Sequence, residues 1–223
     1  RAIVRGTDQL SMRVLVGRPY RSTPVFTETM KYLVYNPYWN VPYSIATRDK
    51  LPLLQRDASA LETQGYEVKT PGSEIFIPVA AVDWSAVSAS KFDYQLRQRP
   101  GPANALGRLK LMLPNPFNVY LHDTPDHSLF QKQERSFSSG CIRLADAMGL
   151  AAWVLGQDSQ TTEVAALEQA VASGETRSVH LGRPLPVLIL YLTAFTDDEG
   201  QVVFRRDIYQ RDKAIVKALR SVN

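Results

Sequence analysis

Cysteine and histidine are scarce in this chain. Its 223 residues include one cysteine, Cys141, and three histidines. A single cysteine cannot form an internal disulfide, so the sequence excludes a small fold that depends on disulfide bonds. The histidines and the cysteine have no spacing typical of metal ligands, so we predict no metal site.

Long hydrophobic runs and blocks of charge of one sign are also missing. No apolar run reaches the roughly 18 residues that a membrane-spanning helix needs, and no signal peptide is visible. The net charge of +4 is spread along the chain without a lysine- or arginine-rich block, so we predict no nucleic-acid partner. The chain starts at Arg1 instead of Met. We therefore expect a processed fragment, with any export signal or membrane anchor upstream.

The hydrophobic content of 44% is ordinary and suits one large domain with a substantial core. Alternating or apolar runs predict strands over residues 10–17, 30–35, 94–99, 109–112, 178–181 and 187–194. The last of these runs is apolar throughout, so we expect it to be a central strand. Amphipathic patterns predict helices over residues 144–155, 162–173 and 207–219. The elements together favour a mostly β, α+β fold.

The segment 138–143 contains the single cysteine, and small residues flank it. Small residues let the backbone bend sharply and let a substrate approach closely. The predicted helix follows directly, and a thiol at a helix N-terminus is favoured as the reactive thiolate. His122 ends an apolar run, so it can face Cys141 across a cleft. This pair is the minimum for nucleophilic acyl transfer. The alternative is a small buried cysteine and a structural histidine.

Several neighbours of this pair are candidate substrate-binding residues. Arg143 carries a guanidinium fork that suits a carboxylate, and an ion pair with a nearby acid is the alternative. Tyr120 precedes the histidine by two residues, so both lie on the same face of a strand, where Tyr120 lines a pocket or packs. Ser139 can orient a substrate or brace its loop. The backbone N–H groups around Gly140 and Cys141 form the natural oxyanion hole.

These residues resemble the signature of a known family. The segments 120–124 (Tyr-Leu-His-Asp-Thr) and 138–143 (Ser-Ser-Gly-Cys-Ile-Arg) are similar to the motifs of the L,D-transpeptidases, whose catalytic domain is of the YkuD type. Ser139 stands where most members have a second histidine, as in the large periplasmic enzymes of Gram-negative bacteria. The segments 40–42, 101–107 and 191–194 extend the resemblance over nearly the whole chain.

The resemblance implies a single catalytic domain over residues 1–223, built as a YkuD-type β-sandwich with edge helices. A capping subdomain, inserted at about residues 38–82, would cover the active site and bring Trp39 to the substrate, although composition alone favours a core position for this residue. The backbone carbonyl of Asp123 would hold the tautomer of the histidine. The carboxylate of Asp123 could do the same, but capping of the following turn is the favoured alternative for this side chain. Related chains have a longer first hairpin, so we expect residues to be missing between Val4 and Arg5.

The resemblance also implies a function. We expect a cysteine-dependent peptidoglycan L,D-transpeptidase of the periplasm that needs no cofactor, with any inner-membrane anchor outside this chain. Its donor would be a tetrapeptide stem, which loses its terminal D-alanine, forms a thioester and is joined to an acceptor stem in a 3→3 cross-link. Carbapenems would acylate Cys141.

Other functions use the same residues. The thioester can be hydrolysed by water, as in an L,D-carboxypeptidase or amidase, or serve to attach or remove a protein at the cell wall. An inactive wall-binding module is a further alternative, which the intact Cys141 and His122 disfavour. A papain-like peptidase is also disfavoured, because those enzymes place the cysteine before the histidine in the chain.

Overall fold

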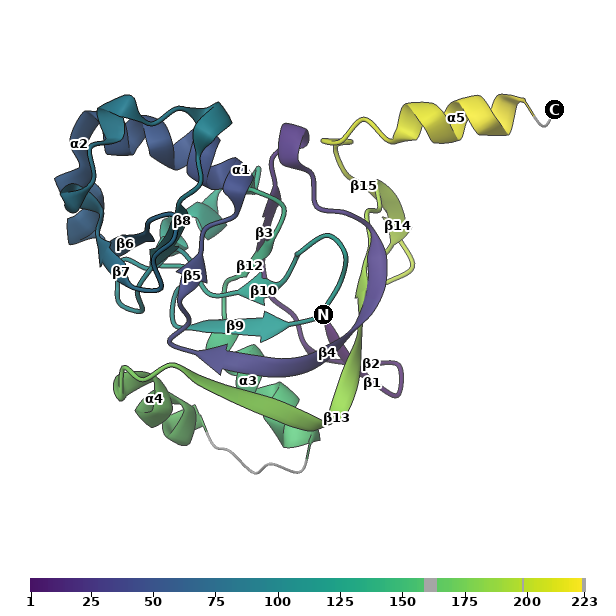
Figure 1. Cartoon of the computed structure of the whole chain (residues 1–223). Coiled ribbons are helices and arrows are strands. Elements are labelled where there is room, and N and C mark those ends of the chain that lie inside the picture. The colour runs from purple at the N-terminus through teal and green to yellow at the C-terminus, as the bar shows by residue number, and fades with distance from the viewer. Residues whose placement is uncertain (159–163, 198, 222–223) are drawn as a thin grey trace.

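The computed structural model describes residues 1–158, 164–197 and 199–221, and its largest element is a curved seven-stranded sheet (Figure 1). The strands lie in the order β11 (Ser136–Ser138), β3 (Val14–Gly17), β12 (Ile142–Leu144), β10 (Leu121–His122), β9 (Leu109–Met112), β4 (Phe26–Tyr35) and β13 (Arg177–Ile189). The pairs β10–β12 and β11–β3 are parallel, and the other pairs are antiparallel. The strand that follows Cys141 therefore lies directly beside the strand that ends in His122.

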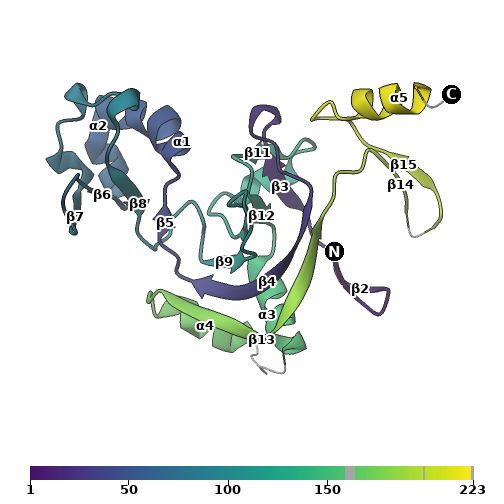
Figure 2. The ribbon, with the colours of Figure 1, turned by 45° about the vertical axis from the view of Figure 1, so that its right-hand side comes forward.

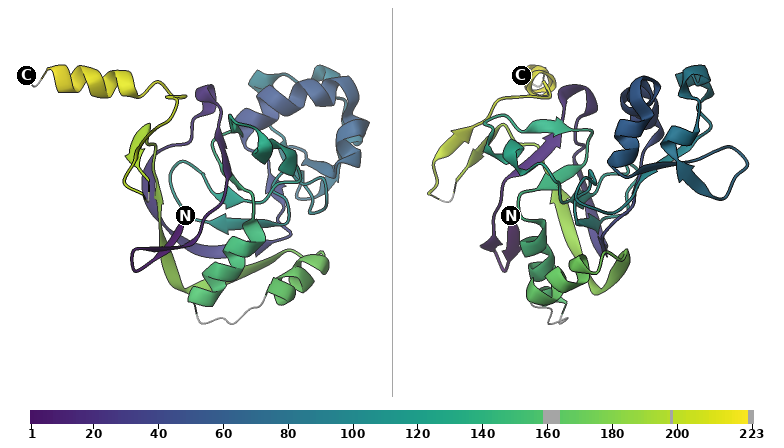
Figure 3. Two further views of the ribbon diagram at one scale, coloured as in Figure 1. Left: turned by 180° about the vertical axis from the view of Figure 1, so that it is seen from behind. Right: turned by 90° about the vertical axis from the view of Figure 1, so that its left-hand side faces the viewer.

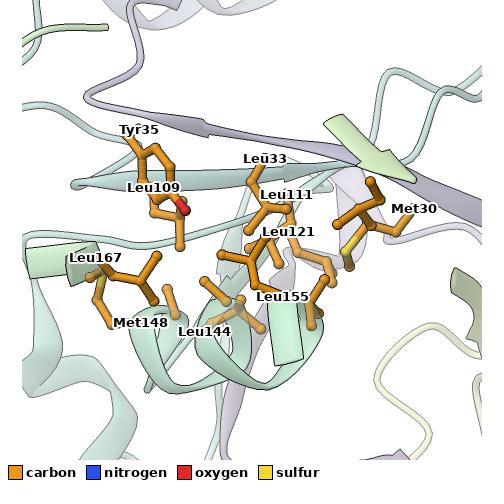
Figure 4. Packing of buried hydrophobic residues seen from close by; sticks show 14 of the residues in the cluster. Met30, Leu33, Tyr35, Leu109, Leu111, Leu121, Leu144, Met148, Leu155 and Leu167 are labelled. Carbon is orange, nitrogen blue, oxygen red and sulfur yellow. The ribbon is translucent and has the colours of Figure 1, made fainter. Parts of the chain in front are cut away.

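The main hydrophobic core lies between this sheet and helices α3 (Ala147–Gln157) and α4 (Val164–Ala172) (Figure 4). Leu33, Leu109 and Leu111 of the sheet are fully buried, and Leu155 and Leu167 of the two helices are almost as inaccessible. Burial of each such side chain stabilises the fold by roughly 1.5–3 kcal/mol. This core holds β9, β10 and β12 in place from one side.

A second, smaller sheet lies apart from the first (Figure 2). Its strands are β5 (Trp39–Asn40), β8 (Gln95–Gln98), β6 (Tyr66–Lys69) and β7 (Phe76–Pro78), in that order. Helices α1 (Tyr43–Ile45) and α2 (Leu51–Thr63) belong to the same part of the chain and are joined by the π-helical turn η2 (Ala46–Lys50). We call residues 39–106 the small body, because their buried side chains, from Trp39 to Leu106, form a core of their own.

Short helical turns and hairpins complete the chain. The turns are η1 (Pro19–Arg21), η3 (Val79–Ala81), η4 (Trp84–Ala86), η5 (Ala89–Lys91) and η6 (His127–Gln131). The hairpins are β1 (Ala2–Val4) with β2 (Thr7–Leu10), and β14 (Ala194–Thr196) with β15 (Val202–Phe204). Helix α5 (Asp212–Arg220) stands away from both sheets (Figure 1, Figure 3). Within the described ranges, no helix has the length and apolar character needed to cross a bilayer.

The strand-rich α+β fold expected from the sequence is confirmed. The predicted strand at 10–17 is divided between β2 and β3. The prediction of a central strand at 187–194 is wrong, because residues 187–189 end the long strand β13 at the edge of the sheet. Val187 and Ile189 pack on the core, whereas Leu188 between them is 59% exposed. An apolar run can therefore occupy an edge strand with only one face covered.

Helix α3 begins later than the predicted helix over 144–155, since Leu144 is the last residue of β12. Asp146 caps the helix, and its carboxylate accepts a hydrogen bond of 2.7 Å from the Gly149 N–H. Cys141 is therefore separated from the helix by a whole strand.

The other two predicted helices are present with shifted starts. The terminal helix predicted over 207–219 begins at Asp212 as α5. The helix predicted over 162–173 corresponds to α4, and its first predicted residue, Thr162, lies outside the described residues.

Candidate active site

Three adjacent strands, β9, β10 and β12, carry two rows of side chains in register. Because side chains alternate between the two faces of a strand, paired residues share a face. One row, which we call the apolar row, packs in the main core and consists of Leu111, Leu121 and Ile142. The other, which we call the polar row, lies on the opposite face and consists of Lys110, His122 and Arg143. The polar row places a histidine between two cations.

His122 and Cys141 line one cavity of about 760 Å³. Its walls come from both parts of the molecule. The part of the chain with the seven-stranded sheet contributes the turn that contains Cys141 together with Arg143 and the segment 117–120. The small body contributes Trp39 and, from the segment 44–50, Ser44, Ile45, Arg48, Asp49 and Lys50. The cavity therefore lies between the two cores, with the two predicted catalytic side chains on its wall.

His122 is held in one tautomer and is neutral. Its Nδ1–H donates a hydrogen bond of 2.5 Å to the backbone carbonyl of Asp123, which leaves Nε2 as an acceptor. The side chain is buried, and burial lowers the pKa of His122 to about 3, with the positive charges of Arg143 and Lys110 acting in the same direction. A neutral imidazole with a free Nε2 is the form that a general base requires.

Cys141 lies in the turn between β11 and β12, and its Sγ is 3.8 Å from the backbone carbonyl oxygen of Asn118. Burial raises the pKa of the thiol, and interactions with Tyr120, Arg143 and Lys110 offset this only in part. The expectation of a thiolate stabilised by the N-terminus of the following helix is therefore wrong, because α3 begins only after β12. The resting pair is a neutral thiol and a neutral imidazole.

The turn around Gly140 is fixed by side-chain bonds. Gly140 has a φ of +117°, a conformation that favours glycine. The Ser138 hydroxyl accepts a hydrogen bond from the Gly140 N–H at 3.1 Å and donates one to the Cys141 carbonyl at 2.5 Å. The Gly140 N–H is thus already used, whereas the Cys141 N–H donates to no acceptor in the described part of the chain. The Cys141 N–H is the donor available to an oxyanion.

The Asp123 carboxylate points away from the histidine. It accepts a hydrogen bond from the Arg108 N–H at 2.9 Å and lies 3.6 Å from the His127 imidazole. A Cβ at Gly107 would come within 2.5 Å of this carboxylate, so the close approach of the loop requires glycine there. The backbone of Asp123 orients His122, and its side chain holds the neighbouring loop.

Arg143 is a cation in the cavity wall. Its Nε is inaccessible to solvent and has no hydrogen-bond partner among the described residues. Burial lowers the pKa of Arg143, and the nearby charge of Arg18 adds to this effect, while the charge of Asp126 opposes it. A buried N–H without a partner is costly, so this geometry suits an anionic group of a ligand.

Tyr120 and Trp39 form the aromatic part of the wall. The Tyr120 hydroxyl interacts with the Cys141 thiol and with Trp39, and burial raises the pKa of Tyr120. Trp39 is only 9% exposed and packs on Tyr66, with ring centroids 6.2 Å apart. Trp39 therefore has both of the positions considered from the sequence, since it belongs to a core and also lines the cavity.

Ser139 is exposed at the cavity rim, where its hydroxyl accepts a hydrogen bond of 2.9 Å from Arg21. The same guanidinium forms a bidentate pair with Asp49 of the small body, at 2.5 and 3.0 Å. Arg21 thus connects the small body, η1 and the cysteine turn. Arg21 was not predicted from the sequence, because nothing local marks it, and Lys110 was not predicted either. The alternation of β9 could have indicated that Lys110 faces away from the core.

Metal-ligating side chains do not gather at the site: across the ranges that the structure describes, no three His, Cys, Asp or Glu residues come together. The arrangement consists of a thiol, an imidazole, a backbone N–H and a guanidinium, and neither the N–H nor the Nε of the guanidinium has an acceptor among the described residues. These groups can attack a carbonyl carbon, move a proton, stabilise an oxyanion and bind a carboxylate.

Comparison with known proteins agrees with this chemistry. A family model of the L,D-transpeptidase catalytic domain, YkuD, matches residues 1–193. A Haemophilus influenzae protein that is provisionally named an L,D-transpeptidase is 34% identical over 206 residues, which make up 92% of this chain. The chain spans 41% of the length of that relative. The match over residues 1–193 shows that the chain belongs to the family of L,D-transpeptidase catalytic domains.

Proposed function

We propose that this domain is a peptidoglycan L,D-transpeptidase that forms 3→3 cross-links through a thioester on Cys141. The observation that carries the proposal is the neutral His122, whose Nδ1 is bound to a carbonyl and whose Nε2 is free, on the wall of the same cavity as the thiol. Family membership supports the substrate class.

The first half of the reaction is acylation. The Nε2 of His122 accepts the proton of the Cys141 thiol as the sulfur attacks the carbonyl carbon of the third residue of a donor tetrapeptide stem. The carbonyl oxygen becomes an oxyanion that accepts a hydrogen bond from the Cys141 N–H. Collapse of this adduct breaks the amide bond, and the amine of the terminal D-alanine leaves with the proton from His122. The products are a thioester and free D-alanine.

The second half transfers the acyl group. The side-chain amine of an acceptor stem attacks the thioester carbon, and the Nε2 of His122 takes a proton from this amine. The carbon–sulfur bond then breaks, and the thiolate recovers the proton from His122. A new amide bond links two stems, and the resting neutral pair is restored. Because neither group carries a charge at rest, proton transfer accompanies the attack on the substrate.

The cavity walls suit a peptide stem. The Arg143 guanidinium would bind a stem carboxylate, which gives its buried Nε a partner. Tyr120 and Trp39 would pack along the donor, and Ser139 with Gly140 would contact it at the rim. The bidentate pair of Arg21 with Asp49 ties the small body to the cavity wall. As a cover of the site, the small body would exclude water from the thioester and favour an amine.

The periplasm is the proposed location, because the proposed substrate is found there. An inner-membrane anchor would belong to a part of the protein outside this chain, which spans 41% of its Haemophilus influenzae relative. Carbapenems are proposed inhibitors, because the carbonyl of their strained β-lactam ring can acylate the same thiol and form a thioester.

The test is incubation of the purified domain with tetrapeptide muropeptides, followed by mass spectrometry of the products. We expect cross-linked dimers and free D-alanine from the wild type and neither from Cys141→Ala, whose thermal unfolding should be unchanged. Tripeptide monomers without dimers would replace the transferase by a carboxypeptidase. Dimers formed by Cys141→Ala would reject the proposed nucleophile.

A further inference from the structure

The threonine at position 23, outside the catalytic motifs, contacts the nucleophile turn directly. Thr23 is 5% exposed and lies after η1. Its Oγ1 donates a hydrogen bond to the Gly140 carbonyl at 2.9 Å and accepts one from the Gly17 N–H at 2.9 Å. A Cβ at Gly17 would lie 2.1 Å from the Arg21 carbonyl oxygen, so the segment 21–23 packs closely on the end of β3. The buried hydroxyl therefore donates one hydrogen bond and accepts another, and both partners are backbone groups.

The hydrogen bond from Thr23 to the Gly140 carbonyl also affects the N–H group of the next residue, Cys141. The Gly140 carbonyl and the Cys141 N–H belong to one peptide unit, which is planar and trans, so they point in opposite directions. A bond that fixes the direction of the Gly140 carbonyl therefore fixes the direction of the Cys141 N–H. The Cys141 N–H is the free donor that the proposed mechanism aims at the oxyanion.

Thr23 is itself held by the C-terminal segment. The Tyr209 hydroxyl donates to the Gly17 carbonyl at 2.7 Å and accepts from the Thr23 N–H at 3.3 Å. The Arg211 Nη2 donates to the Thr23 carbonyl at 3.2 Å. Both groups lie beyond residue 193, where the match to the family domain ends. The backbone donor and the backbone acceptor of Thr23 are thus bound by residues close to helix α5.

The C-terminal segment is well braced at this point. The Asp207 carboxylate accepts hydrogen bonds from the Tyr191 hydroxyl at 2.6 Å and from the Arg211 N–H at 3.0 Å. The rings of Tyr191 and Tyr209 stack with centroids 4.9 Å apart, and the Arg211 guanidinium lies 5.1 Å from each of them. These contacts give the Tyr209 hydroxyl a fixed position, which a positioning role requires.

We propose that Thr23 is a positioning residue that aims the Cys141 N–H at the oxyanion, and that Tyr209 and Arg211 hold Thr23 in place. The inference rests on the proposed thioester chemistry, since it assigns Thr23 a role in stabilising the adduct that precedes the thioester. The C-terminal segment is then part of the catalytic support and not only an appendage of the domain.

The test compares two reactions of the same thiol. Acylation by a carbapenem passes through an oxyanion, whereas alkylation by iodoacetamide does not. Thr23→Val keeps the shape of the side chain and removes its hydroxyl. We expect this variant to be acylated roughly 10- to 100-fold more slowly, since loss of an oxyanion donor costs about 100- to 1,000-fold in comparable sites. Its alkylation rate should stay within about twofold of the wild type.

Two further variants control the comparison. Thr23→Ser keeps the hydroxyl and should restore acylation to near the wild-type rate. Tyr209→Phe removes only the distal hydroxyl, so we expect a smaller loss of acylation, again without change in alkylation. Equal rates of acylation in Thr23→Val and the wild type would overturn the inference, as would equal losses in both reactions. A wild type that neither accepts the carbapenem nor forms dimers would instead overturn the proposed function.

Discussion

The two faces of the paired strands β9, β10 and β12 have different roles: one contributes to the hydrophobic core and the other carries side chains of the candidate active site. The apolar row is enclosed in the main core. The polar row lies on the opposite face, where Arg143 and the proposed base, His122, line the cavity. Neighbouring residues in the chain, such as Leu121 and His122, therefore have different environments. A shift in register by one residue would exchange the two rows, so the burial of the apolar row also fixes the geometry of the polar row.

The two rows also differ in energetic cost. Burial of the apolar row is favourable in itself, because it removes hydrocarbon surface from water. The polar row holds a histidine whose pKa is lowered and an arginine whose Nε is buried without a partner. Both features lower the stability of the folded protein. The arginine can bind an anionic ligand, and the neutral histidine can accept the proton of the thiol. Stability and chemistry should therefore respond to different substitutions.

Substitution in the apolar row should have the largest effect on stability. Leu111 has no exposed surface and pairs with Leu121. We expect Leu111→Ala to lower the free energy of unfolding by about 2–5 kcal/mol, because it removes buried methyl groups and leaves a cavity. The rate of carbapenem acylation per folded molecule should stay within about threefold of the wild type. Urea unfolding and stopped-flow acylation measure the two quantities.

A conservative variant controls this first comparison. Leu111→Met keeps the volume of the side chain and should cost less than about 1.5 kcal/mol. A large loss of acylation by folded Leu111→Ala, without a matching loss of stability, would show that the two faces are not separable.

Substitution in the polar row should give the converse result. We expect Arg143→Gln to lower kcat/KM for a tetrapeptide donor roughly 10- to 100-fold, because a charge-assisted hydrogen bond to a carboxylate contributes about 1.5–3 kcal/mol. Stability should change by less than about 1 kcal/mol, since the Nε of Arg143 already lacks a partner. Arg143→Lys is the matched control, which keeps the charge and loses the fork, so it should recover only part of the activity. Unchanged kcat/KM in Arg143→Gln would exclude Arg143 as the carboxylate site.

The two faces were not equally predictable from the sequence. Cys141 and His122 were indicated by their local motifs, and the alternation in 109–112 is also local. The protonation state of the Cys141 thiol was not indicated by the sequence, because the pairing of β12 with β3 places the start of helix α3 away from Cys141. The contacts of Thr23 were not indicated either. Thr23 lies 117 residues from Gly140 and is held from the C-terminal segment, so only the tertiary arrangement brings these groups together.

The last prediction concerns how the polar row links stability to pH. The pKa of His122 is about 3 in the folded protein and about 6.5 in an unfolded chain. Between these values the unfolded chain binds a proton that the folded protein does not. The free energy of unfolding should therefore be largest above pH 6.5 and fall as the pH drops towards 3, by about 1.4 kcal/mol per pH unit from this residue.

His122→Gln isolates this contribution, because glutamine is polar and does not titrate. The other two histidines and all carboxyl groups remain in both proteins, so their effects cancel in the difference. The stability of the wild type minus that of the variant should decline between pH 6.5 and pH 4.5, as measured by urea unfolding. A difference that stays constant over this range would mean that the histidine takes up a proton in the folded state. Below about pH 6.5 the buried polar row would then hold three cations, and the base of the proposed mechanism would be charged there.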